Sequence, residues 1–98
     1  WYPGLVGESS DYLDRFILRG VFNATEAATG DFGSEDTIEQ NIRWSQATST
    51  FTITGSYTGV NVQVNDNRNI WFRLDLPATS STSKDQQITV TITGKKYE

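Results

Sequence analysis

The fold class of this chain is decided by residues 87–93, QITVTIT. Ile and Val alternate there with Thr, which is the two-residue period of a strand with one dry and one wet face. Two similar stretches precede it, TFTIT at residues 50–54 and VNVQV at residues 60–64. Because β-branched residues at this spacing favour strands over helices, the sequence predicts a small all-β protein.

Two further segments extend this pattern. Residues 15–23, RFILRGVFN, are apolar at both odd and even positions, as expected for a strand covered on both faces. Residues 70–76, IWFRLDL, alternate strictly until Pro77, which cannot donate to a sheet. The expected inward positions of this second strand are Ile70, Phe72, Leu74 and Leu76, and the expected outward ones are Trp71, Arg73 and Asp75. With strands at 37–46, 49–55, 60–64 and 86–93, the prediction is an antiparallel β-sandwich or jelly roll of six or seven strands.

The length of 98 residues fits one domain with one modest core. Residues 1–14 are rich in turn-forming residues and are expected to be an N-terminal extension, followed by a single β-sandwich domain at residues 15–98. The sequence starts at Trp1 rather than at Met. That start predicts an exported, extracellular or cell-surface protein whose signal peptide is removed before Trp1.

The composition argues against several functions. The chain has no His, no Cys and no Met, so it lacks the commonest general base and the usual nucleophile–base pairs. We therefore expect no enzymatic activity and no cofactor. A formal net charge of −4 disfavours nucleic acid as a partner, because a phosphate backbone attracts clustered Lys and Arg. No apolar run approaches the ~20 residues that span a bilayer.

An acidic group around Gly33 is the first candidate site. Asp31, Glu35 and Asp36, with Glu39 nearby, offer the carboxylate oxygens that Ca²⁺ prefers. The spacing does not match an EF-hand loop, and the favoured alternative is a solvated acidic loop with no metal. The NDN turn at residues 65–67 is a second calcium candidate, which we interpret as a hairpin turn.

Aromatic residues form the second candidate site. Trp44, Tyr57 and Trp71 are candidate ligand-facing rings for stacking on sugars, and the alternative is that they pack in the core or at an interface. A one-residue slip in register would turn Trp71 to the opposite face. Asn23 opens an Asn-Ala-Thr sequon, which predicts a glycosylation site in an exporting eukaryote or archaeon.

A contact between copies of the chain is the third candidate. Two aromatic residues at the start, Trp1 and Tyr2, are expected to be buried against another surface. If residues 15–23, or the stretch before them, pair with an open sheet edge of a neighbour, each subunit completes the next. The residues expected at this subunit interface are Trp1, Tyr2, Phe16, Ile17, Leu18, Val21 and Phe22. This pattern predicts a homopolymer, the structural subunit of an extracellular filament or pilus.

Residues 70–93 resemble the end of jelly-roll domains in exported fibre proteins. The resemblance is carried by WFRLDLP at residues 71–77, the Ser/Thr-rich loop after it, and QITVTIT at residues 87–93. The families are the TasA/camelysin-like proteins and the archaeal bundling pilins. The resemblance implies a jelly-roll subunit that polymerises by donor-strand complementation.

A non-catalytic binding module is the alternative function. Small β-sandwiches also serve as carbohydrate-binding domains and as phage or cell-surface adhesion domains, with surface glycans as partners, and the fold alone does not choose between them. The two interpretations differ in their partner: a filament subunit binds copies of itself, whereas a module binds a ligand through exposed rings.

Overall fold

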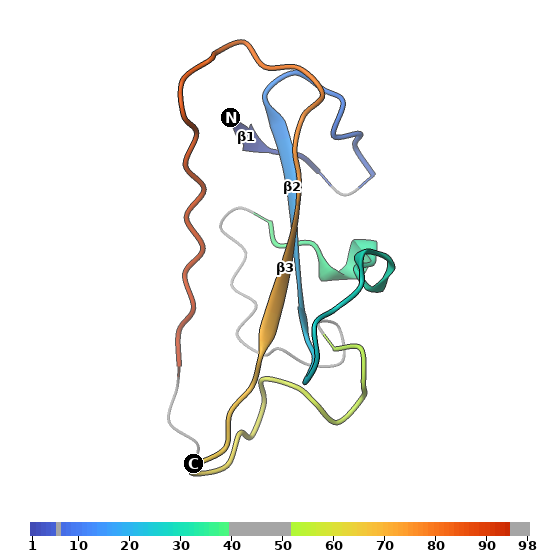
Figure 1. Cartoon of the computed structure of the whole chain (residues 1–98), viewed down its shortest axis with the longest axis vertical. Helices are drawn as coiled ribbons and strands as arrows, with labels where there is room; N and C mark the ends of the chain where they lie inside the picture. The colour runs from blue at the N-terminus through green and yellow to red at the C-terminus, as the bar shows by residue number, and fades with distance from the viewer. Residues whose placement is uncertain (6, 40–51, 95–98) are drawn as a thin grey trace.

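A computed structural model describes residues 1–5, 7–39 and 52–94 of the chain. These residues contain no α-helix, which confirms the prediction of a small, non-helical β fold. They form one three-stranded sheet of order β1-β2-β3 (Figure 1). The elements are β1 (Tyr2–Pro3), β2 (Arg15–Phe22), the 3-10 helices η1 (Thr29–Asp31) and η2 (Ser34–Asp36), and β3 (Ile70–Asp75).

The central strand is β2, the segment whose sequence is apolar on both faces. It pairs with β3 in antiparallel fashion from Ile17↔Asp75 to Phe22↔Ile70. Its other edge pairs with β1 and then forms isolated bridges to Thr37 and Thr52. Because both edges of β2 are occupied within its own chain, residues 15–23 do not offer a free strand for donation in this fold. The sequence left open whether these residues or the stretch before them are donated, and in this structure residues 15–22 form the central strand of their own sheet.

The described residues do not form the expected sandwich of six or seven strands. Residues 60–64 are turn and irregular chain, because Asn61 adopts φ 57° and interrupts the extended backbone. Of the strands expected at 37–46 and 49–55, only the single bridges at Thr37 and Thr52 are seen, and the remaining residues of 40–51 lie outside the described part. Residues 86–94 form an extended segment that pairs with no described strand.

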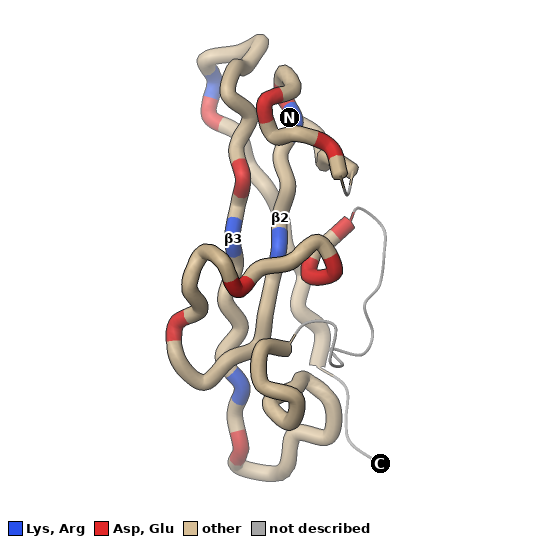
Figure 2. Tube along the Cα trace, turned by 90° about the vertical axis from the view of Figure 1, so that its right-hand side faces the viewer, with Lys and Arg blue, Asp and Glu red and all other residues tan. Residues whose placement is uncertain are grey.

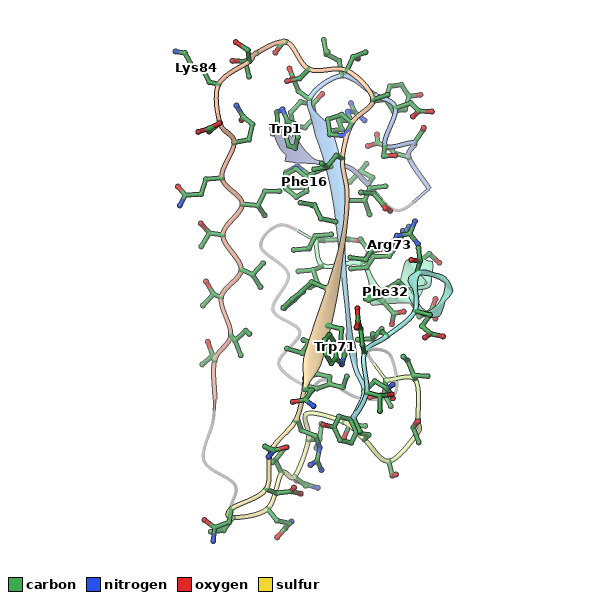
Figure 3. The ribbon with its side chains drawn as sticks, viewed as in Figure 1. Trp1, Phe16, Phe32, Trp71, Arg73 and Lys84 are labelled. Carbon is green, nitrogen blue, oxygen red and sulfur yellow. The ribbon has the colours of Figure 1, made fainter. Side chains whose placement is uncertain are left out.

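The two faces of the β2–β3 pair differ. Residues 24–37, with both 3-10 helices, cover one face, and Figure 3 shows Phe32 and Arg73 on that side. Ile38 lies at the other face, where it approaches Gly20 and the Phe72 ring. The other face carries Phe72 and Leu74, which the sequence predicted to be inward and which are instead exposed. Trp71, expected outward, is half-buried. The prediction of the buried face of this strand is therefore wrong, because alternation fixes two faces without fixing which of them is covered.

The chain buries little surface for its size. Its accessible area is 7209 Å² for 11.0 kDa, against roughly 5600 Å² for a typical folded monomer of that mass. Its radius of gyration is 14.8 Å, against about 13 Å for a compact chain of this length. The buried apolar side chains of the described residues are Phe16, Ile17, Leu18, Val21 and Phe32, and of these Val21 is fully buried. In the same residues, no helix has the length and apolar character needed to cross a membrane.

Candidate interaction surface

One apolar feature of the described surface is the outer part of β3 and the residue that follows it. Phe72, Leu74 and Leu76 are 42%, 43% and 53% exposed, and we call these three side chains the open face. They alternate along one side of the strand, with the buried Leu18 opposite Leu74 in the ladder. Covering them completely would stabilise an assembly by about 1 kcal/mol each, since full burial of a Leu or Phe contributes about 1.5–3 kcal/mol.

The opposite face of the same strand is closed by polar contacts. Arg19 and Arg73 lie directly opposite each other in the ladder, a like-charge pair that is visible at mid-height in Figure 2. Asp75 bridges them, accepting from Arg19 Nη1 at 2.8 Å and from Arg73 Nε at 2.9 Å. Arg73 Nη1 also donates to the carbonyl of Thr29, 3.1 Å away, which fastens η1 over this face. The polar side is therefore covered and held by ion pairs, with the buried Arg19 Nε left without a hydrogen-bonding partner among the described residues. The apolar side is the more exposed one.

Residues 1–14 pack against the sheet instead of leaving it. The amide of Gly4 donates to the carbonyl of Phe16 at 2.6 Å, which continues the pairing of β1 with β2. The Arg15 guanidinium lies 5.2 Å from the ring centroid of Tyr2 and 5.1 Å from that of Tyr12. Its hydrogen bonds to the Tyr2 hydroxyl and to Glu8 raise the pKa of Arg15. A cation between two rings thus holds the start of the chain in place.

Asp14, Ser80 and Ser81 form a hydrogen-bonded cluster, which we call the latch. It fixes the loop after β3 to the N-terminal residues just before β2. Asp14 adopts φ 63°, a left-handed conformation that Asp tolerates better than most residues. Its carboxylate accepts from the hydroxyl and the amide of Ser81 and from the Ser80 hydroxyl. The bonds from Ser81, followed by that from Ser80, lower the pKa of Asp14. Trp1 adds a bond from its indole nitrogen to Ser80 Oγ at 2.9 Å.

The residues expected at a subunit interface fall into two groups. Phe16, Ile17, Leu18 and Val21 are buried within the chain, so in this structure they build its own core. Phe22 and Trp1 are half-buried, and Tyr2 is 48% exposed. The structure therefore brings Trp1 and Tyr2 to the corner that carries the latch. It does not bring them together with the open face.

The candidate ligand-facing rings are partly engaged. The indole nitrogen of Trp71 donates to the carbonyl of Asn23 at 2.9 Å. The Tyr57 ring lies under the Arg68 guanidinium, 4.9 Å from its centroid, and its hydroxyl accepts from the amide of Asn69. Trp44 lies outside the described residues. Tyr57 and Trp71 are both half-buried, so neither presents an open platform for stacking on a sugar.

The acidic residues serve the turns that they belong to. Asp31 accepts from the amide of Ala28 at 2.8 Å, and Asp36 accepts from the amide of Gly33 at 2.7 Å. Asp36 is only 4% exposed, and its burial raises its pKa. Glu35 is exposed and Glu39 half-buried. In the part of the chain that the structure describes, no three acidic side chains gather into a group that could hold a metal ion.

The sequon asparagine and the second calcium candidate are also used locally. The side-chain nitrogen Nδ2 of Asn23 donates to the carbonyl and the hydroxyl of Thr25, two residues further along the chain. In the turn at residues 65–67, the Asp66 carboxylate accepts from Arg68 and from the amide of Asn67, which lowers its pKa. Because Arg68 already pairs with the Asp66 carboxylate, residues 65–67 agree with their interpretation as a turn.

Sequence reasoning missed both the open face and the latch. The alternation of residues 70–76 signals an apolar face but contains nothing that says whether another layer covers it. Asp14 carries no signal of its own in the sequence, because its partners Ser80 and Ser81 lie more than sixty residues away. Only the folded chain brings the two loops together.

A comparison of the chain with protein-family models, with characterised proteins and with solved structures finds no match.

Proposed function

We propose that this protein is a structural subunit of an extracellular filament, in which each copy completes the β structure of the next by strand donation. The observation that carries the proposal is the open face of Phe72, Leu74 and Leu76. A monomer with an accessible area of 7209 Å² and an uncovered apolar strand face is stabilised by a second layer of protein. In the filament, neighbouring copies supply the strands that turn this small sheet into a jelly-roll-like sandwich.

The physical argument for a polymer is one of symmetry. A donated segment and the edge that receives it are different parts of the same chain, so the contact is heterologous. A heterologous contact that does not close into a ring propagates from copy to copy. Backbone hydrogen bonds to the added strand provide the register, and alternate apolar side chains fill the receiving face.

The alternative of a carbohydrate-binding or adhesion module receives less support. Such a module needs aromatic rings with a free face, and Trp71 and Tyr57 are half-buried and engaged by neighbours. The open face combines one aromatic and two aliphatic side chains in a row along a strand, an arrangement that suits another β-strand.

The test is negative-stain electron microscopy and sedimentation of the purified full chain, compared with Leu74→Lys. We expect uniform fibres from the parent protein and none from Leu74→Lys, because a charge on the open face is costly to bury in the contact. The matched control is Ser83→Lys, which makes the same charge change on an exposed loop and is expected to form fibres. A parent protein that stays a monomer at all concentrations would overturn the proposal.

A further inference from the structure

Residues 86–94, which we call the arm, form an extended segment on the open-face side of the sheet. Figure 1 shows the arm in red-orange, apart from the β2–β3 pair and running opposite to β3. In the described part of the chain, no backbone group of residues 87–94 has a hydrogen-bonding partner. Ile88 is half-buried, Val90 is 39% exposed and Ile92 is 71% exposed. The arm is strand-like in sequence and in shape, yet it joins no described ladder.

The composition of the arm makes a permanently free state costly. Residues 86–94 contain no charged residue and no Pro, two of the features by which natural proteins protect exposed strand edges. An alternating Ile/Val–Thr segment of this kind is a template for pairing with another strand. The arm therefore needs an edge to pair with, and β3 has one edge with no described partner.

The latch holds the loop before the arm against the N-terminal residues. Ser80 and Ser81 are bound to Asp14, and the Gln86 side chain accepts a hydrogen bond from the Trp1 amino group at 3.2 Å. These contacts tie the loop before the arm to the N-terminal corner, next to Trp1 in Figure 3. From these contacts the arm extends away from the N-terminal residues.

Donor and acceptor match in length and pattern. At about 3.3 Å per residue the arm spans about 30 Å, which exceeds the roughly 20 Å of β3. Ile88, Val90 and Ile92 alternate with the same period as Phe72, Leu74 and Leu76 on the open face. When the arm adds to the β3 edge with its apolar side chains toward the open face, the six side chains form one continuous layer.

We infer that the arm of one copy adds as a strand to the edge of β3 that has no described partner in a second copy, so that the donated segment of the filament is residues 86–94. The inference rests on the proposed function and names the two surfaces that carry it. Neither surface includes residues 15–23, which remain the central strand of each subunit.

Engineered cysteines test the contact directly, because the chain has no Cys of its own. Full-length Val90→Cys is mixed with an equal amount of Phe72→Cys, Leu74→Cys or Leu76→Cys and oxidised with diamide. Paired side chains on one face of neighbouring strands come close enough for a disulfide. We expect a disulfide-linked dimer in at least one mixture and a large loss of it when Thr91→Cys, on the other face of the arm, replaces Val90→Cys.

A proline scan of the arm gives a second readout. Thr91→Pro and Val90→Pro each remove one backbone donor, and successive donors point to opposite edges of a strand. We expect at least one of them to reduce sedimented fibre at least about tenfold, which corresponds to one lost interaction of about 1.4 kcal/mol. Thr91→Ala and Val90→Ala, which keep the backbone donors, are expected to retain more fibre than the matching Pro variant. Because the arm makes no described ladder bonds, the monomer fold is expected to remain intact by circular dichroism.

Three outcomes would overturn the inference, and they are distinguishable. Fibres that form without any inter-copy disulfide and tolerate both prolines would exclude the arm while leaving the proposed function in place. A disulfide within a single chain of the double variant Leu74→Cys/Val90→Cys, with none between chains, would show that the arm folds back on its own sheet. A parent protein that forms no fibre and no inter-copy disulfide would remove the inference together with the proposed function.

Discussion

At the scale of single residues, two carboxylates use the same chemistry in opposite environments. Asp14 is half-buried and accepts several hydrogen bonds, which lower its pKa. Asp36, the last residue of η2, is buried, and its carboxylate accepts a hydrogen bond from the amide of Gly33. Desolvation by this burial raises its pKa. The sign of each shift is set by whether hydrogen bonds or burial dominates. The two residues therefore respond to pH in opposite directions.

The Asp14 latch is expected to weaken in acid. Its folded-state pKa is lowered below the ordinary value of 3.8, so its contribution to stability is present above that value and is lost as pH falls through the folded pKa. Asp14→Asn keeps an acceptor and tolerates positive φ, whereas Asp14→Ala loses both properties. Urea unfolding at several pH values should rank the parent above Asp14→Asn and Asp14→Asn above Asp14→Ala near neutral pH. The gap between the parent and Asp14→Asn should close in acid, and a gap that is independent of pH would contradict the role of the charge.

Replacing the buried Asp36 with Asn is expected to leave the stability unchanged or to increase it at neutral pH. The raised folded pKa means that the carboxyl contributes most below its unfolded value of 3.8, and that this contribution is lost as pH rises through the folded value. Asn has no carboxyl group to ionise, so Asp36→Asn avoids this loss of stability at higher pH. It keeps an acceptor for the amide of Gly33. The control is Asp36→Ala, which leaves that amide unpaired and should cost about 1 kcal/mol. Equal losses in both variants, measured by urea unfolding, would contradict the interpretation.

At the scale of elements, β2 organises the molecule because both of its faces and both of its edges are engaged. The buried side chains of Phe16, Ile17, Leu18 and Val21 come from this strand. The ladder to β3, the short β1 and the bridges to Thr37 and Thr52 occupy its edges. A strand with so many contacts is a fixed part of the subunit, whereas the arm carries none of these ladder bonds within the described residues.

Gly20 sits at the most crowded point of β2. A Cβ there would lie 3.1 Å from Ile38 Cδ1 and 3.4 Å from the Phe72 ring. Gly20→Val is therefore expected to destabilise the fold by about 1–3 kcal/mol through overpacking. Gly30→Val, where a Cβ meets nothing within 4 Å, is the control and should cost much less. Denaturant midpoints of the two variants provide the comparison, and a similar loss in both would argue against close packing at Gly20.

At the scale of the whole molecule, the main feature is that the chain leaves much apolar surface exposed to solvent. The chain extends over 46 × 25 × 20 Å and leaves the open face and the arm exposed. A domain of this size that builds only one small sheet in its described part has little core to offset chain entropy. In the proposed filament, association would supply the missing burial, so the stability of the protein is expected to be coupled to its concentration.

This coupling predicts a thermal midpoint that rises with protein concentration. Each tenfold increase in subunit concentration contributes about 1.4 kcal/mol to an association equilibrium. Leu74→Lys, with its altered open face, should show a midpoint that is independent of concentration and equal to that of the dilute parent. Differential scanning calorimetry across a concentration series measures both. A parent midpoint that does not change with concentration would argue against stabilising assembly.

The sequence by itself determined the all-β class and the identity of the strands at residues 15–22 and 70–75, because alternation and β-branched residues act locally. It also marked residues 87–93 as strand-forming, although their described backbone joins no ladder. Tertiary structure alone decided that Phe72 and Leu74 face outward and that Asp14 holds Ser80 and Ser81. The reason is physical: a two-residue period defines two faces of a strand, but which face is covered depends on segments that arrive from far along the chain.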